Sequence, residues 1–285
     1  MIGRRTIAGG ALAALAGACS PARLLSGLDR VTGGGAGSRR VAAGVPFGTH
    51  GQRLDVYAPE GIGPWPVVVF FYGGSWQEGA RGGYAFAGRA LAGQGFVTVV
   101  PDYRKVPGVR FPAFVEDGAE AVAWTAANIS KWGGQADAIG VAGHSAGAYI
   151  AVMLALDARY LAAAGAPGAV RAGVGLSGPY DFLPLTGAAI PAMGSAPDPQ
   201  ATQPIRFARA DAPPLLLVTS GDDTLVRPRN AYNLAARLRS LGAKVELKDY
   251  AGLDHSEVVM ALSRPFRGKG DVLADMSGFL HRTLG

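Results

Sequence analysis

The residues of this chain best suited to chemistry are the pentapeptide Gly143–Gly147, which reads Gly-His-Ser-Ala-Gly. An apolar run over residues 138–142 precedes it, and an apolar pattern of helical spacing follows it. A sharp turn from strand to helix presents a serine hydroxyl beside the N–H groups that open the helix, where negative charge is favoured. Glycine is needed on both sides because such a turn leaves no room for a Cβ. The pattern predicts that Ser145 is a nucleophile.

A serine nucleophile requires a base, and the base requires a group that orients it. Of the four histidines, His50 lies in an early turn, His144 is the variable residue of the pentapeptide, and His281 lies in the predicted last helix. His255 follows the predicted last strand, in a loop that can fold back over the carboxyl edge of a sheet, where open α/β folds place their sites. We therefore predict that His255 is the base.

The orienting carboxylate is expected at the end of the preceding strand, where Asp222 and Asp223 stand side by side. One aspartate of such a pair commonly caps the turn or the next helix. From position alone, both carboxylates remain candidates.

Acyl transfer also requires N–H donors aimed at the developing oxyanion. One predicted donor is the main chain of Ala146, directly after the serine. Another is expected from the loop Tyr72-Gly73-Gly74-Ser75-Trp76, which follows a buried strand and whose glycines allow the main chain to approach a substrate oxygen.

The elements that must position these residues alternate between strands and helices. Apolar or alternating runs predict strands at residues 41–47, 53–57, 66–72, 96–100, 138–142, 170–176, 215–219 and 244–250. Helical patterns fall at residues 84–92, 113–131, 230–241 and 270–284. This alternation predicts an α/β fold with a mostly parallel sheet and helices on both faces. The Pro-rich stretch 182–211 is too long for a simple connection, so we expect a lid or insertion there.

The composition of the chain excludes several kinds of binding partner and site. The 285 residues are 49% hydrophobic and 17% charged, which is ample for one core. The net charge of +6 is mild, and the arginines form no stripe interleaved with aromatic residues, so we expect no nucleic-acid partner. The single cysteine, Cys19, excludes an internal disulfide and any cysteine-based metal cluster.

The N-terminal residues predict export. Arg4 and Arg5 precede a short apolar run that ends at Ala18, which is typical of a secretory signal. The sequence around Cys19 resembles a bacterial lipoprotein processing site, and the paired arginines resemble a twin-arginine signal. We expect a signal over residues 1–19, a flexible linker over 20–40 and one domain over 41–285. The protein would be a membrane-anchored lipoprotein lipidated at Cys19, or a periplasmic or secreted enzyme cut near Ala18.

The order nucleophile, acid, histidine resembles that of the α/β-hydrolase fold, from about residue 41 to the C-terminus. Within that fold the chain looks like the hormone-sensitive-lipase and kynurenine-formamidase group of carboxylesterases, whose loop reads His-Gly-Gly-x-Trp. Here Tyr72 replaces that histidine. The resemblance implies that Gly74 and Ser75 are the loop's oxyanion donors. Its Asp-x-x-Val spacing favours Asp223 over Asp222.

The resemblance also implies a function. We expect a serine carboxylesterase that cleaves small, short-chain acyl esters through an acyl-enzyme, with no metal or organic cofactor. Trp76 and Tyr103 are expected to bind substrate. An arylformamidase, or an acetyl or feruloyl carbohydrate esterase, would use the same triad. A catalytically idle envelope binding protein is the alternative from another class, and the presence of all three triad residues argues against it.

Overall fold

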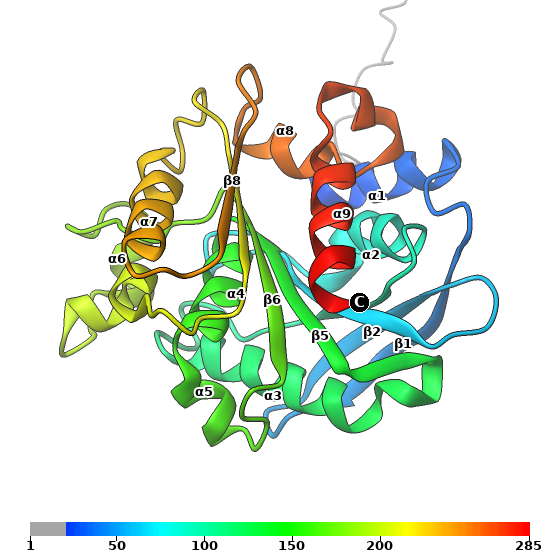
Figure 1. Ribbon diagram of the computed structural model, residues 1–285, viewed down its shortest axis with the longest axis horizontal. Coiled ribbons are helices and arrows are strands. Elements are labelled where there is room, and N and C mark those ends of the chain that lie inside the picture. The colour runs from blue at the N-terminus through cyan, green and yellow to red at the C-terminus, as the bar shows by residue number, and fades with distance from the viewer. Residues whose placement is uncertain (1–20) are drawn as a thin grey trace, which may run out of the picture.

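One eight-stranded sheet forms the centre of the molecule in the computed structural model, which describes residues 21–285 (Figure 1). Its strands are β1 (Ser38–Phe47), β2 (Gln52–Pro59), β3 (Trp65–Phe71), β4 (Val97–Pro101), β5 (Gly134–His144), β6 (Val170–Leu176), β7 (Leu215–Thr219) and β8 (Val245–Asp249). The spatial order is β1-β2-β4-β3-β5-β6-β7-β8. β2 pairs antiparallel with β1 and β4, and all other pairs are parallel. The predicted, mostly parallel sheet is confirmed.

Helices cover both faces of this sheet. The α-helices are α1 (Pro21–Val31), α2 (Ala85–Ala92), α3 (Ala113–Asn128), α4 (Ala146–Leu156), α5 (Ala158–Ala163), α6 (Ala189–Met193), α7 (Arg229–Ser240), α8 (His255–Met260) and α9 (Val272–Leu284). Short 3-10 helices are η1 (Arg81–Tyr84), η2 (Ile129–Trp132), η3 (Pro199–Thr202), η4 (Pro204–Phe207) and η5 (Arg264–Lys269).

Two glycines in adjacent strands show how closely the layers pack. A Cβ at Gly140 of β5 would meet Leu280 of α9. A Cβ at Gly173 of β6 would meet Ala155 of α4. Gly140 pairs with the residue before Gly173, so the two glycines face opposite sides of the sheet. The layer on the side of Gly140 contains α9 and its neighbour α2. The layer on the side of Gly173 contains α4 and its neighbour α3 (Figure 1).

The strands that carry the predicted site are buried on both faces. From Val67 to Phe71, every side chain of β3 is fully buried, as is every side chain of β7. Such strands appear as continuous apolar runs because neither face meets water. This burial explains why the ranges predicted for β6 and β7 match the structure to the residue.

The prediction of a flexible linker over residues 20–40 is wrong for residues 21–40, the part that the structure describes. Residues 21–31 form α1, and β1 begins at Ser38. α1 lies beside α2 (Figure 1) and is fixed there by polar groups. The Asp29 carboxylate pairs with Arg89 at 2.6 Å, and the Ser26 hydroxyl donates to the Gly83 carbonyl at 2.7 Å. Ser26 and Asp29 form the buried face of this helix, so its pattern did not look like that of a packed element.

The segment of residues 182–211 contains α6, η3 and η4 and packs against the body of the domain. The Tyr149 hydroxyl of α4 donates to the Thr202 carbonyl at 2.9 Å. The Gln203 side chain accepts a hydrogen bond from the Phe182 N–H at 2.7 Å. That this segment acts as a lid stays a prediction.

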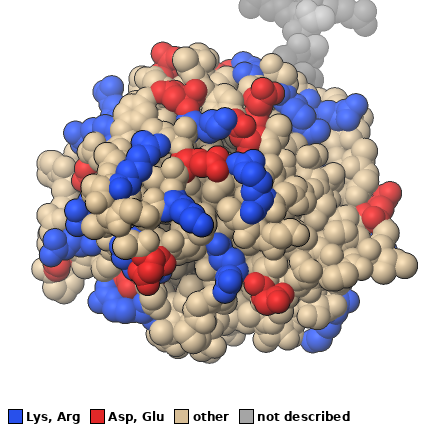
Figure 2. Space-filling model, viewed as in Figure 1, with Lys and Arg blue, Asp and Glu red and all other residues tan. Residues whose placement is uncertain are grey.

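Charge on the visible face is mixed. In Figure 2, Lys and Arg side chains lie among Asp and Glu side chains, with no continuous basic band on that face. Among the helices of residues 21–285, none is both long and apolar enough to cross a membrane.

Candidate active site

The serine turn has the strained geometry that its sequence predicts. Ser145 has φ 55° and ψ −121°, outside the conformations that L residues prefer, and its N–H donates to the Leu176 carbonyl of β6 at 2.9 Å. A Cβ at Gly147 would lie 2.1 Å from the Phe71 carbonyl oxygen, and one at Gly143 would lie 2.3 Å from that of Gly147. The two glycines therefore allow β5 to turn into α4 with Ser145, which is 8% exposed, at the carboxyl end of the sheet.

His255 and Asp223, which are 32 residues apart, meet in a buried hydrogen bond. The His255 Nδ1 and Asp223 Oδ2 atoms are 2.7 Å apart. Asp223 Oδ1 accepts the N–H groups of Leu225 and Val226 at 3.0 and 2.8 Å. Because an ionised carboxylate only accepts, Nδ1 of His255 carries the proton of this hydrogen bond. When the ring is neutral, the lone pair is then on Nε2, which can act as a base.

The pKa of the Asp223 carboxyl lies below its usual range. Burial alone raises this pKa, but the hydrogen bond and charge of His255 and the N–H of Val226 lower it further than burial raises it. Asp223 is therefore ionised at neutral pH, as a group that stabilises an imidazolium must be.

Asp222 has a different position. It is exposed, and its Oδ2 atom accepts the Gly252 N–H at 2.6 Å. The Ser220 hydroxyl donates to the Leu253 carbonyl at 2.6 Å. These two bonds join the loop after β7 to the loop after β8. Asp222 thus ties together the loops that carry Asp223 and His255.

The start of α8 fixes the main chain of His255. Asp254 caps this helix, and its carboxylate accepts the N–H groups of Ser256 and Glu257, both at 2.8 Å. The Glu257 side chain accepts the Asp254 N–H in return, at 3.0 Å. This reciprocal cap satisfies the free N–H groups of the helix and holds His255 as its first residue.

The loop after β3 is curled so that two N–H groups remain available. Gly74 has φ 139°, and Ser75 and Trp76 have φ 54° and 59°. The Gly74 carbonyl accepts the N–H groups of Gln77 and Glu78. Within residues 21–285, no protein atom accepts the N–H of Gly74 or of Ser75. The predicted donors are thus unpaired, and the N–H of Ala146 lies in the first turn of α4, where helical N–H groups lack partners.

Tyr103 does not line the site. It is 2% exposed, stacks on Tyr72 at 4.5 Å between ring centroids, and donates its hydroxyl proton to the Tyr72 carbonyl at 2.9 Å. The Tyr72 hydroxyl lies 3.2 Å from both Asp102 Oδ1 and Lys105 Nζ. These contacts support the loop from beneath. The prediction that Tyr103 binds substrate is therefore wrong, because the side chain is enclosed.

Trp76 belongs to an aromatic cluster on the α4 side of the loop. Its ring packs against those of Phe114, Tyr149 and Phe182, with centroids 5.5 to 6.5 Å apart. Tyr149 is one helical turn after Ser145 and fully buried. The cluster thus fills the space beside the α4 helix next to the nucleophile.

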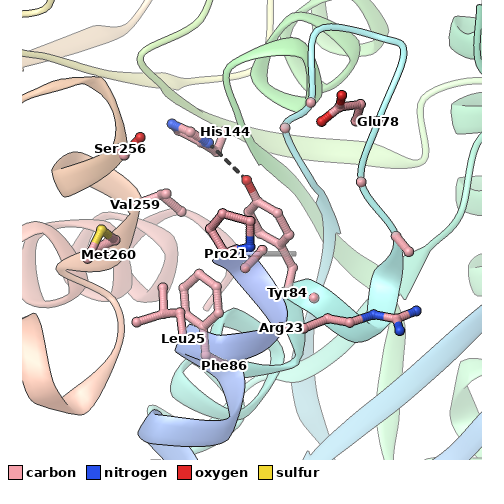
Figure 3. A pocket seen from close by; sticks show the side chains of 16 residues that line it. Pro21, Arg23, Leu25, Glu78, Tyr84, Phe86, His144, Ser256, Val259 and Met260 are labelled. Carbon is pink, nitrogen blue, oxygen red and sulfur yellow. Dashed lines mark hydrogen bonds between the residues drawn. The ribbon is translucent and has the colours of Figure 1, made fainter. Parts of the chain in front are cut away.

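A residue whose role the sequence did not reveal lies at the back of the site. His144 is 5% exposed, and its Nε2 atom is 3.0 Å from the His255 carbonyl oxygen. Its Nδ1 atom is 3.3 Å from the Tyr84 hydroxyl (Figure 3). Burial, followed by the positive charge of His255, lowers the pKa of His144 to about 3. No local pattern could reveal these contacts, because they join residues 60 and 111 positions apart.

A cavity of about 560 Å³ adjoins His144 on the side of α1 and α8 (Figure 3). Its walls come from α1, η1, α2, α8 and the loop after β3, and the lining includes Leu25, Phe86, Val259 and Met260. Gly73 and Gly74 border it, but Ser145, Asp223 and His255 are not part of its lining.

Residues 21–285 contain no group of three or more His, Cys, Asp or Glu side chains arranged to hold a metal ion. Cys19, the predicted lipid anchor, lies outside the described residues.

Comparison with known proteins found a matching family model, related sequences and similar solved structures. The BD-FAE family model matches residues 54–238. Esterase LipC of Mycobacterium tuberculosis is 32% identical over 228 residues, which are 72% of this chain and 56% of LipC. A probable isoprenylcysteine alpha-carbonyl methylesterase of Oryza sativa is 28% identical over 262 residues, 84% of this chain and 63% of that protein. The chain thus spans less than two thirds of either relative.

Among solved structures, a truncated carbohydrate esterase from gut microbiota is similar, with a TM-score of 0.74 and 20% identity. The likeness covers 86% of this chain and 95% of that one. It shows a shared α/β-hydrolase fold, as the resemblance to that family predicts.

Proposed function

The chain belongs to the BD-FAE family, and we propose that it is a carboxylic ester hydrolase. In this proposal Ser145 is the nucleophile, His255 is the base and Asp223 is the acid that orients the base. The observation that carries the proposal is the His255–Asp223 hydrogen bond of 2.7 Å, which fixes the orientation of the His255 ring at the carboxyl edge of the sheet, where Ser145 also lies. Relatives named as esterases support the reaction class.

In the acylation step, the Ser145 hydroxyl oxygen attacks the carbonyl carbon of the ester while His255 Nε2 takes the hydroxyl proton. Asp223 stabilises the imidazolium that forms. When the tetrahedral intermediate collapses, the bond to the leaving alcohol breaks, and His255 returns the proton to that oxygen. The acyl group stays on Ser145, and water repeats the sequence to release the acid.

We assign the oxyanion to the N–H groups of Gly74, Ser75 and Ala146. Within residues 21–285 the first two donate to no protein atom, and the third opens a helix whose dipole favours negative charge. Donors fixed by the curled loop need no rearrangement as charge develops, which is why such groups accelerate acyl transfer.

We propose that the acyl group is short. The rings of Trp76, Tyr149 and Phe182 pack against one another beside the first turns of α4, and in this proposal they limit the room for the acyl chain. Trp76 thus has the role of a wall that limits chain length. An arylformamidase is the less favoured alternative, since LipC and the rice protein both bear esterase names.

The proposal is tested by turnover of p-nitrophenyl esters with acyl chains of two to twelve carbons. Short-chain esters should be the preferred substrates. Ser145→Ala should lower kcat by at least about three orders of magnitude without loss of the folded state, because triad members act as a unit. Activity near that of the wild type in this variant would refute the assignment of the nucleophile. A preference for long chains would refute the short-chain substrate class alone.

We also propose that the protein is exported and anchored through Cys19, on the basis of the N-terminal sequence pattern. Radiolabelled palmitate should enter the full chain in a bacterial host and be absent from Cys19→Ala. An unlabelled but exported wild-type protein would instead indicate a signal peptide cut near Ala18.

A further inference from the structure

We propose that His144 is a positioning residue, which holds the main chain of His255 and thereby sets the distance between the base and the nucleophile. The inference rests on the proposed function, because it assigns a role within the same site. It starts from one contact, the 3.0 Å separation between His144 Nε2 and the His255 carbonyl oxygen.

The tautomer of His144 follows from its two partners. A carbonyl oxygen only accepts, so His144 Nε2 carries the proton and donates it to His255. Nδ1 of the neutral ring then holds a lone pair, which accepts the hydroxyl proton of Tyr84 at 3.3 Å (Figure 3). Tyr84 thus favours the tautomer that His255 requires. The three residues form a directed chain of hydrogen bonds from η1 through β5 to α8.

The ring of His144 has little room to adopt another position. A Cβ added at Gly73 would lie 2.9 Å from His144 Nδ1, so even a methyl group would displace the ring. The rings of His144 and His255 are 4.8 Å apart between centroids. The His144 side chain is almost fully enclosed, so solvent does not compete for its Nε2 proton.

His144 directly precedes Ser145, whereas the carbonyl that it binds belongs to the catalytic histidine itself. One side chain therefore links the segment that carries the nucleophile to the segment that carries the base. Without this bond, the start of α8 would be held by its cap and by the Asp223 pair. A misplacement of about 1 Å between reacting groups can cost roughly 100-fold in rate.

The neutral state of His144 suits this position. His255 becomes positively charged in each half of the proposed reaction, and a second cation at a ring distance of 4.8 Å would oppose that charge. The low pKa of His144, caused by its burial and by the neighbouring His255, keeps the ring uncharged at neutral pH. His144 can therefore donate to the main chain of His255 without a net charge.

Two variants of His144 distinguish a role in positioning His255 from a role in filling space. In His144→Leu the volume is kept and the donor is lost, and we expect kcat to fall about 10- to 100-fold while KM changes less than about threefold. In His144→Gln the terminal amide can donate near the place of Nε2, and we expect kcat within about fivefold of the wild type. Circular dichroism confirms that each variant is folded.

Equal activity in His144→Leu and the wild type would contradict the inference, and so would equal losses in the Leu and Gln variants. An NMR measurement tests it in the unmodified protein: the ¹⁵N shifts of His144 should report the neutral Nε2–H tautomer from pH 5 to 8. A titration within that range, or the Nδ1–H tautomer, would overturn the proposal even if His144→Leu fails to fold. A wild-type protein without ester turnover would instead count against the proposed function, and the NMR result would still decide the tautomer.

Discussion

Asp222 and Asp223 are neighbours in the chain, but their carboxylates have different surroundings. Asp223 is 1% exposed and faces His255, whereas Asp222 is exposed and accepts a main-chain N–H from the next loop. Burial and a charged partner, rather than residue type, thus distinguish the candidate acid from the carboxylate that joins the loops.

This difference predicts unequal effects of isosteric substitution. Asp223→Asn should lower kcat by about three to four orders of magnitude, because an amide can stabilise the wrong tautomer of the catalytic histidine. Asp222→Asn keeps an oxygen that can accept the Gly252 N–H, so its kcat should stay within about threefold. Ester hydrolysis by the two purified variants provides the comparison. The reverse ranking would assign the acid to Asp222.

His144 predicts a dependence of stability on pH. Its pKa is lowered to about 3 in the folded protein from about 6.5 in the unfolded chain. Between these values the unfolded chain binds the extra proton, so acidification favours unfolding and stability is lost as the pH falls below about 6.5.

Urea unfolding at pH 7 and pH 4.5 measures this effect when the wild type is compared with His144→Gln, which has no titratable group at that position. The wild type should lose about 2 kcal/mol more than the variant over this interval, at roughly 1.4 kcal/mol per pH unit. Equal losses would mean that His144 is protonated in the folded protein.

Among the elements, α1 lies where the sequence predicted a flexible linker. Its buried face carries Ser26 and Asp29, while Leu24, Leu28 and Val31 are exposed. Analysis of amphipathic helices assumes that the apolar face is buried. Here charge pairing with Arg89 holds the helix instead, and that partner is 60 residues away.

Two substitutions in α1 should have opposite effects on the free energy of unfolding. Asp29→Ala leaves Arg89 and the Arg264 N–H without their partner and should destabilise the protein by roughly 3 kcal/mol. Gly27→Ala should stabilise it by about 0.5–1 kcal/mol, since a Cβ there meets no atom within 4 Å and alanine favours a helix.

Chemical denaturation measures both effects, and hydrogen exchange over residues 21–31 reports where they act. Glu60→Ala, at an exposed position, is the matched control. If neither substitution changed stability, residues 21–31 would behave as the flexible linker that the sequence suggested.

The elements that carry the site were predictable for a physical reason. The central parallel strands are buried on both faces, so they stand out as apolar runs, and the serine turn has a steric requirement for glycine that is visible in the sequence. α8 was missed because its six residues are too few for a periodic pattern. Its cap, Asp254 with Glu257, is a local signal that could have revealed it.

At the scale of the whole molecule, the sheet brings together segments that are distant in the chain. β3, β5, β7 and β8 end at one edge, and the segments after them hold the candidate oxyanion donors, Ser145, Asp223 and His255. In a parallel sheet the carboxyl ends of the strands share an edge, so residues at these ends converge whatever their separation in sequence. The alternation of strands and helices predicted the parallel sheet, and the order of the three candidate residues added the resemblance to the α/β-hydrolase fold.

The same architecture does not determine the substrate. Contacts beside the candidate nucleophile, such as that of Trp76 with Phe182, join the loop after β3 to the segment after β6. Side-chain packing between such loops leaves no periodic pattern in the sequence. Tyr103 illustrates this point, because its place next to the predicted site suggested contact with substrate, whereas the structure encloses it beneath Tyr72.

Activation of Ser145 by His255 can be tested by covalent labelling with a fluorophosphonate. The intact protein is treated with the probe, and the modified residue is located by peptide mass spectrometry. We expect a single label on Ser145, which is lost in Ser145→Ala and forms at least about three orders of magnitude more slowly in His255→Ala. A folded wild-type protein that takes no label, or takes it on another residue, would contradict the account and favour a catalytically idle binding protein.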